Sequence, residues 1–180
     1  MPLLSPSPDH EQAYLDFVRD WAEHGEDITP YFVRYLQESY AEFLTFCDGL
    51  TSWDTCSEGF VPSSNFFLME DDRLVGALNL RHALTPSLTF RGGHIGYGVR
   101  PSERGKGYAT QMLQLGLEKA RSLGLEKVLV TCSKSNSASA AVIEHNGGII
   151  ENEVDDDGDV TLRYWITLSP EATEENSTLE

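Results

Sequence analysis

The sequence predicts a single mixed α/β domain of the α+β kind, with helices flanking a central and mostly antiparallel sheet. Three observations predict it. The chain has 180 residues, the size of one domain with a substantial core. Helical and strand-like segments follow in the order helix, helix, hairpin, strand, helix, strand, helix, hairpin. No internal repeat or linker divides the chain. The central strand–helix–strand unit predicts one parallel, right-handed strand pair.

The N-terminal part is expected to form two helices and a long loop. Residues 9–25 carry apolar side chains at helical spacing. Residues 29–50 are expected to form one continuous helix, with Thr29 as N-cap and Pro30 in the first helical position. Residues 51–65 have no period and contain several turn formers, so we expect a loop that is either functional or a flexible connector.

Strands and helices alternate in the rest of the chain. Asp71-Asp72 and Asp157-Gly158 predict tight turns, each between the two strands of a hairpin. The expected strands cover 65–70, 73–81, 92–100, 125–133, 148–154 and 160–168, and the expected helices cover 107–124 and 136–148. Residues 169–180 are polar and acidic, so we expect a disordered tail.

The formal net charge of −16 restricts the possible partners. Nucleic acids and anionic membranes are bound by basic surfaces, so this charge argues against both as partners. An acidic surface attracts cationic substrates, but it also serves simply to keep a protein in solution. The net charge therefore argues against two classes of partner and does not identify a substrate.

Cysteine and histidine usage predicts neither a disulfide framework nor a metal site. The three cysteines are widely spaced, and the five histidines show no ligand spacing with one another or with the cysteines. We expect free thiols in a reducing compartment. The N-terminus does not have the pattern of a signal peptide, and no stretch is long enough to span a membrane. The prediction is a cytoplasmic protein without a bound metal.

The stretch VRPSERGKGYATQML, residues 99–113, concentrates basic residues and glycines at the start of an expected helix. The first turn of a helix exposes unpaired N–H groups and the positive end of the helix dipole. Gly105 and Gly107 let an anion approach this backbone, and Arg104 and Lys106 add positive charge. The arrangement is typical of phosphate sites, and the alternative is a tight turn with solvated basic residues. The spacing fits neither the P-loop nor the Rossmann motif.

The segment RGKGYA resembles the acetyl-CoA-binding motif Q/R-x-x-G-x-G/A of the GNAT superfamily of N-acetyltransferases, with Arg104, Gly107 and Ala109 at the motif positions. The later segment SNSASAAVIEHNGG is similar to the second conserved region of that family, with Asn136 and Ser139 at the matching positions. The amino-acid sequence around both segments looks like that of a subgroup of predicted bacterial acetyltransferases whose substrates are generally unassigned.

The resemblance covers about residues 66–168 and implies a GNAT-like domain over residues 1–168, with its N-terminal helices within 9–50. It implies that the two parallel strands splay apart, that acetyl-CoA is the co-substrate and that no metal is needed. Backbone N–H groups of the turn would hold the pyrophosphate, and the strand before it would pair with the pantetheine arm. The implied cofactor-binding residues are Val99, Arg100, Arg104, Gly105, Lys106, Gly107, Tyr108, Ala109, Thr110, Asn136 and Ser139.

The catalytic groups are not carried over by the resemblance. The family often places a Tyr general acid at the position of Ile143 and a Glu or His at the position of Gly93. Tyr97 and Tyr164 remain as candidates for proton transfer, although a tyrosine on a strand is more often a core residue.

The implied activity is transfer of an acetyl group from acetyl-CoA to the amine of a small molecule or peptide. Two alternatives are a protein acetyltransferase and a non-catalytic acyl-CoA-binding sensor module. The acceptor is expected among the N-terminal helices, the 51–65 loop and the region of Arg81 and Arg91, whose side chains either pair with a substrate carboxylate or are solvated. Dimers are common in the family, so a homodimer is one expected form.

Overall fold

Seven strands and five α-helices make up the part of the chain that the structure describes. This computed structural model describes residues 1–34 and 39–168, except the side chain of Asp156. The helices are α1 (Glu11–Glu23), α2 (Tyr40–Gly49), α3 (Pro86–Phe90), α4 (Tyr108–Ser122) and α5 (Ser137–His145). The strands are β1 (Leu3–Leu4), β2 (Ser63–Glu70), β3 (Arg73–Arg81), β4 (Ile95–Val99), β5 (Lys127–Ser133), β6 (Ile149–Asp156) and β7 (Asp159–Thr167).

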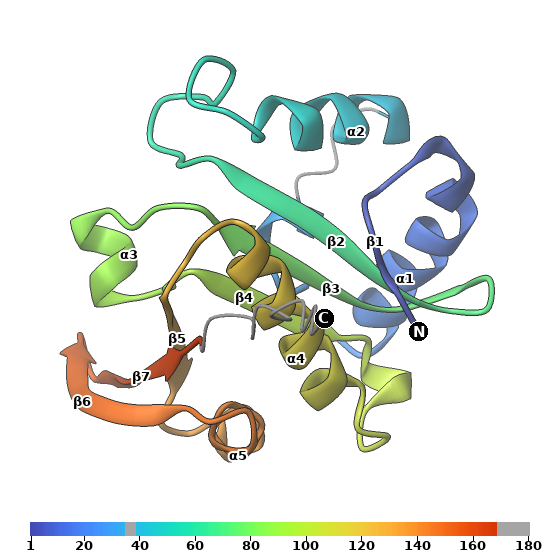
Figure 1. The fold of residues 1–180 in the computed structure, drawn as a ribbon. Helices are drawn as coiled ribbons and strands as arrows, with labels where there is room; N and C mark the ends of the chain where they lie inside the picture. Colours follow the sequence, from blue (N-terminus) through green and yellow to red (C-terminus); the bar gives the residue numbers. More distant parts are fainter. Residues whose placement is uncertain (35–38, 169–180) are drawn as a thin grey trace, which may run out of the picture.

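The strands form one sheet in the order β1-β2-β3-β4-β5-β7-β6. Every neighbouring pair is antiparallel except β4 and β5, which are parallel and connected through α4. Helices α1 and α2 cover one face of the sheet, and α4 and α5 cover the other (Figure 1). The predicted mixed fold, with both hairpins and a parallel central pair, is therefore confirmed.

Two apolar clusters hold these layers together. Under α1 and α2, aromatic rings stack on the sheet: the ring centroid of Phe43 lies 4.6 Å from that of Tyr14 and 6.2 Å from that of Phe67. On the opposite face, α4 approaches the sheet closely at Gly116, where an added Cβ would lie 2.6 Å from Cδ1 of Leu78. This close packing sets the position of α4 and so of its N-terminus.

The expected continuous helix over residues 29–50 is wrong. Tyr31–Arg34 forms a 3₁₀ turn, and α2 begins only after Ser39. Ser39 is extended, with φ −148° and ψ 160°, and its side chain accepts a hydrogen bond from the Glu42 N–H at 3.3 Å. A serine that caps a new helix competes with continuation of the preceding one, and the apolar spacing alone does not reveal this competition.

Two short elements were not expected from the sequence. Strand β1 pairs with β2 at the edge of the sheet, and α3 begins after the N-cap Thr85, whose side chain accepts from the Leu88 N–H at 3.1 Å. Both are too short for their period to be recognised. The predicted tail 169–180 lies outside the described residues, and the domain boundaries stay a prediction. No helix in the described ranges has the length and apolarity to cross a membrane.

Candidate active site

The parallel strands β4 and β5 meet at one end and separate toward the other, as expected. Their only paired residues are Ile95 and Val130. Next to this pair, the backbone N–H of His94 donates to Leu129 O at 2.8 Å. The ring Nδ1 of His94 accepts from the backbone N–H of Leu129 at 2.9 Å. Burial lowers the pKa of His94 to about 4, so the ring is neutral and can accept this bond. The neutral ring thus fixes the closed end of the splay.

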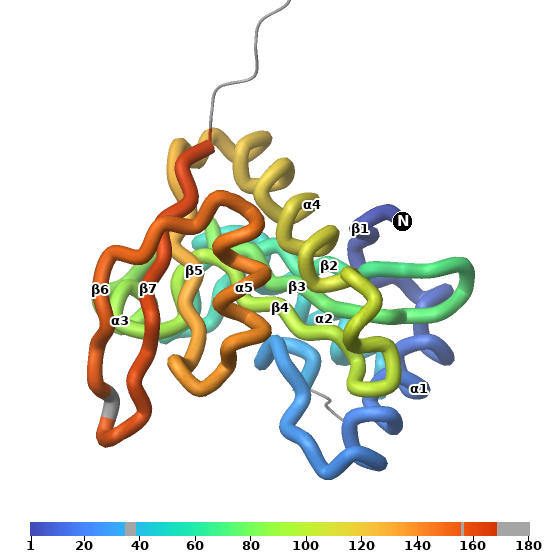
Figure 2. The backbone as a smooth tube through the Cα atoms, turned by 90° about the horizontal axis from the view of Figure 1, so that it is seen from below, coloured from blue at the N-terminus to red at the C-terminus, as the bar shows by residue number. Residues whose placement is uncertain are grey.

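A cleft of about 580 Å³ lies beside the open end of the splay. It is bounded by β4, the β4–α4 turn, the first turn of α4, the start of α5 and the chain after α1; α4 and α5 lie on the same face of the sheet (Figure 2). The lining residues are Trp21, Glu26, Asp27, Thr29, Tyr97, Gly98, Val99, Glu103, Arg104, Gly105, Gly107, Tyr108, Ala109, Thr110, Asn136, Ala138, Ser139 and Val142.

The N-terminus of α4 has the backbone geometry of an anion site. Gly105 and Gly107 adopt left-handed conformations, with φ values of 79° and 84°. An added Cβ at either glycine would meet no atom within 4 Å, so both face open space. The first hydrogen bond of the helix runs from Gln111 N to Gly107 O at 3.2 Å, which leaves the preceding N–H groups outside the helical ladder. A phosphate fits this cradle.

Two buried carboxylates hold the β4–α4 turn in place. Asp20 of α1 accepts from the Ser102 N–H at 3.1 Å. Glu103 pairs with Lys106 and with Arg73, each at 2.6 Å. The hydrogen bond from Lys106 is the main cause that keeps the pKa of Glu103 below its usual range. These contacts determine the shape of the turn before any ligand arrives.

The side chains of Arg100 and Lys106, both predicted as cofactor ligands, have partners within the chain. The guanidinium of Arg100 is buried against α1, where Nε lies 3.4 Å from Asp20 Oδ2 and NH1 donates to Leu74 O at 3.3 Å. The Lys106 ammonium is engaged by Glu103. Neither residue lines the cleft. Both basic side chains brace the turn, because the carboxylates packed beneath it take up their charges.

Arg104 is the basic residue of the turn that lines the cleft. Its two terminal nitrogens donate to the two carboxylate oxygens of Glu26 at 2.9 and 2.7 Å. Its guanidinium carbon lies 5.0 Å from the ring centroid of Trp21, and Nε donates to Val99 O at 3.3 Å. Trp21 and Glu26 were not predicted as site residues, because no local motif connects them to a turn about eighty positions later.

Tyr97 and Ser139 both line the cleft and are in direct contact with each other. The Tyr97 hydroxyl lies 2.9 Å from Ser139 Oγ, and the Ser139 N–H donates to Asn136 Oδ1 at 3.0 Å. Asn136 is thus the N-cap of α5. Burial raises the pKa of Tyr97 to about 12, so its hydroxyl stays protonated at neutral pH. A protonated hydroxyl in the wall of a cleft can donate a proton or a hydrogen bond.

The structure places the second predicted tyrosine elsewhere. Tyr164 of β7 is buried, and its hydroxyl donates to Glu144 Oε1 at 3.2 Å. It does not line the cleft. Tyr164 belongs to the apolar cluster under α5, on the far side of β5 from β4, and its role in proton transfer stays a prediction.

The structure explains the two positions where the family's usual catalytic groups are missing. An added Cβ at Gly93 would lie 2.3 Å from Leu129 O, so no side chain fits there. Ile143 is fully buried in the core. Arg81, expected to be solvated or to bind substrate, instead donates to Gly92 O and Gly93 O at 3.1 Å each. Arg81 therefore supports the turn before β4.

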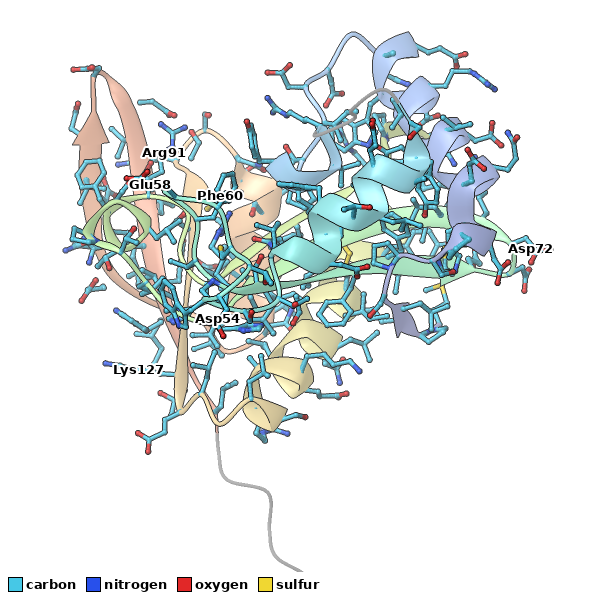
Figure 3. All side chains as sticks on the ribbon, turned by 90° about the horizontal axis from the view of Figure 1, so that it is seen from above. Asp54, Glu58, Phe60, Asp72, Arg91 and Lys127 are labelled. Carbon is cyan, nitrogen blue, oxygen red and sulfur yellow. The ribbon has the colours of Figure 1, made fainter. Side chains whose placement is uncertain are left out.

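Two parts of the region expected to hold the acceptor, the long loop and the neighbourhood of Arg91, lie at the other end of the sheet from the β2–β3 turn. Figure 3 shows Glu58 and Phe60 of the long loop at the same end of the sheet as Arg91, far from Asp72. Arg91 pairs with Asp159 at 3.0 Å, so its charge has a partner within the chain. Strand β2 begins at residue 63, two positions before the expected end of that loop.

Comparison with known proteins decides the family. The sequence model of the acetyltransferase (GNAT) domain matches residues 3–149, which includes the N-terminal helices as well as the cleft. The chain belongs to the GNAT acetyltransferases. No curated protein matches the sequence closely enough to count as a relative.

Solved structures resemble this GNAT chain in fold. RimJ of Mycobacterium smegmatis, solved with CoA-disulfide, has a TM-score of 0.67 at 22% identity, over 92% of this chain and 80% of its own. RimL, a ribosomal alpha-N-protein acetyltransferase solved with coenzyme A, has a TM-score of 0.63 at 20% identity, over 92% and 93%. A mutant of the spermidine N-acetyltransferase SpeG of Vibrio cholerae has a TM-score of 0.61 at 16% identity, over 93% and 95%. At these identities the likeness shows a shared GNAT fold.

We expect Glu103 to contribute to stability in a pH-dependent way. A Glu103→Gln substitution should lower the free energy of unfolding at pH 7 by about 1–2 kcal/mol, because two charge-assisted contacts of a buried carboxylate are lost. The pKa of Glu103 is lowered in the folded state, so its contribution is fully present above about pH 4.3, the unfolded value, and is lost as the pH falls further.

Urea denaturation at pH 7 and at pH 3 measures this contribution. The matched control is Glu153→Gln, which breaks the half-exposed pair of Glu153 with Lys134 and should change the free energy of unfolding by less than about 0.5 kcal/mol. Equal losses in the two variants at pH 7 would contradict the role given to Glu103.

Proposed function

We propose that this GNAT protein is an acetyl-CoA-dependent N-acetyltransferase that acts on the amine of a small molecule or peptide. The observation that carries the proposal is the N-terminus of α4, where two left-handed glycines face open space at the mouth of a cleft beside splayed strands. This is a phosphate cradle next to a groove of suitable size for an extended, partly apolar arm.

The roles of the cleft residues follow from their positions. Backbone N–H groups from Gly105 to Ala109 would hold the pyrophosphate, with the Thr110 hydroxyl beside them. The backbone of Val99 would pair with the pantetheine arm along β4. Across the cleft, Asn136 and Ser139 would contact the arm from the start of α5. The side chains of Arg100 and Lys106 are left out, since the structure engages them elsewhere.

Direct acyl transfer requires the acceptor amine to lose a proton, a C–N bond to form, the C–S bond to break and the departing thiolate to take up a proton. An alkyl ammonium has a pKa near ~10.4, so it must be deprotonated before it attacks. We assign the proton given to the thiolate to the Tyr97 hydroxyl, which lines the cleft and is protonated at neutral pH. Ser139, 2.9 Å away, orients that hydroxyl.

A protein amine is the second candidate acceptor. RimL is described as a ribosomal alpha-N-protein acetyltransferase, and its fold covers most of this chain. A non-catalytic acyl-CoA sensor is the third reading, because the two usual catalytic positions hold Ile143 and Gly93. Each reading keeps the same cofactor cleft and differs only in what, if anything, receives the acetyl group.

The test is thiol release from acetyl-CoA in the presence of separate pools of amines, polyamines, amino acids and basic peptides, beside calorimetry with acetyl-CoA alone. We expect saturable binding of acetyl-CoA and release with at least one pool. Binding without release from any pool would contradict a small-molecule or peptide acceptor. Mass spectrometry of proteins incubated with the enzyme and acetyl-CoA would then separate a protein acceptor from a sensor. An absence of binding would overturn the proposal as a whole.

A further inference from the structure

Arg104 is the basic residue of the β4–α4 turn that lines the cleft, and its guanidinium is paired with a carboxylate from the N-terminal part of the chain. Glu26, just after α1, pairs with Arg104 through both of its oxygens, at 2.9 and 2.7 Å. Both residues line the cleft together with Gly105 and Gly107. The Arg104 hydrogen bond is the main cause of the lowered pKa of Glu26, so the carboxylate is ionised at neutral pH.

Arginine presents a planar fork of donors that matches a carboxylate and a phosphate in the same two-pronged geometry. A bound phosphate at the α4 N-terminus would lie beside Arg104 and compete with Glu26 for these donors. From this geometry we propose that Glu26 is a competing anion: it holds Arg104 before the cofactor binds and is exchanged for a phosphate of acetyl-CoA. The inference rests on the proposed function, because it requires that the cleft take a phosphate-bearing cofactor.

The exchange has a structural consequence, because Glu26 belongs to a segment that packs on β4. The Thr29 carbonyl lies so close to Gly98 that an added Cβ there would be 2.1 Å from it. Pro30 lies over Gly96, with 3.5 Å between Pro30 Cβ and an added Cβ. Residues 24–30 are therefore tied to the turn through Glu26 and to β4 through Thr29 and Pro30. Loss of the Arg104 contact loosens this segment where it joins α1.

The affinity for coenzyme A tests the competition. We expect Glu26→Gln to bind coenzyme A about two- to fivefold more tightly than the unsubstituted protein, the range set by a half-exposed ion pair. Affinity for pantetheine, which has no phosphate, should not change. The matched control is Asp27→Asn, which removes the neighbouring carboxylate of the same segment; Asp27 also lines the cleft, but its partner is Arg34 and not Arg104. The increase in affinity for coenzyme A in Asp27→Asn should be less than half of that in Glu26→Gln.

A double-mutant cycle makes the test specific to the contact. In an Arg104→Ala background, the gain from Glu26→Gln should disappear, because no cation is left to compete for. Calorimetry at low ionic strength measures all four variants, and circular dichroism checks that each is folded. An equal gain in the Arg104→Ala background, or an equal gain in Asp27→Asn, would show a general charge effect and overturn the inference.

Hydrogen exchange provides a second readout. Coenzyme A should slow amide exchange in residues 105–110 and speed it in residues 24–30, which lose their contact with Arg104. Slower exchange in both segments would overturn the inference while leaving the cofactor site intact. No binding of coenzyme A to any variant would overturn the proposed function, and the inference with it.

Discussion

Replacing Gly107 with glutamate will weaken acetyl-CoA binding by at least about a hundredfold while the protein stays folded. The glycine is the N-cap of α4 and has a φ of 84°, and an added side chain meets no protein atom within 4 Å. The new carboxylate would thus occupy the space in front of the helix N-terminus, where it repels a phosphate. Like charges brought together at a binding site cost several kcal/mol, which corresponds to this loss of affinity.

The control for this substitution is Gly158→Glu. Gly158 also has a positive φ, 91°, and also faces open space, but it lies in the β6–β7 turn away from the cleft. Both variants carry the same backbone strain of about 1–2 kcal/mol, so their thermal unfolding should shift by similar amounts. Only Gly107→Glu should lose binding in calorimetry. Unchanged binding in folded Gly107→Glu would remove the phosphate site from the α4 N-terminus.

Replacing Tyr97 with phenylalanine is expected to lower kcat by about a hundredfold with little change in KM for acetyl-CoA. The Tyr97 hydroxyl is the proposed proton donor to the thiolate, and loss of a general acid typically costs at least this factor. The substitution keeps the ring in its wall of the cleft, so cofactor binding should persist. Steady-state thiol release with the acceptor pool found active measures both constants.

The pH dependence of kcat gives a further check on Tyr97. The pKa of its hydroxyl is raised to about 12, so the protonated donor is present across the neutral range and is lost only above about pH 11. Below that pH, the wild-type kcat should therefore show no alkaline decrease that depends on Tyr97. A decrease that depends on Tyr97 would be present in the wild type and absent from Tyr97→Phe. Such a decrease near pH 8 would mean that a group other than Tyr97 supplies the proton.

Tyr164→Phe is the matched control for the kinetic experiment. It removes the same hydroxyl from a buried strand tyrosine, one whose partner is Glu144 and which lies outside the cleft. We expect a small loss of stability and a kcat within about twofold of the wild-type value. If both tyrosine variants lost kcat equally, packing under α5 would explain the effect better than proton transfer.

The tyrosine pair illustrates what sequence alone leaves open. Tyr97 and Tyr164 lie on β4 and β7, on either side of β5 in the sheet, and both carry a pKa raised to about 12. Their residue type and strand context are the same. They differ in place: Tyr97 lines the cleft beside the open end of the β4–β5 splay, whereas Tyr164 of β7 lies outside the cleft with Glu144 as its partner. No local pattern encodes that difference.

Most of the elements, and the glycine-bearing turn before α4, could be predicted from the sequence because their causes are local. Gly107 at the start of α4, Asn136 as the cap of α5 and the turns of both hairpins act within a few residues of their position in the chain. These local signals also carried the family resemblance. The family match over residues 3–149 agrees with it.

Which charges meet depends on how distant parts of the chain pack together. Arg100, Arg104 and Lys106 look alike in the sequence, yet their partners are Asp20, Glu26 and Glu103. Two of these three partners come from α1 and the chain just after it, roughly eighty positions earlier. The energy of an ion pair depends on distance and burial, and both are set when α1 packs against the sheet. The basic turn was visible in the sequence, but which of its cations lines the cleft was not.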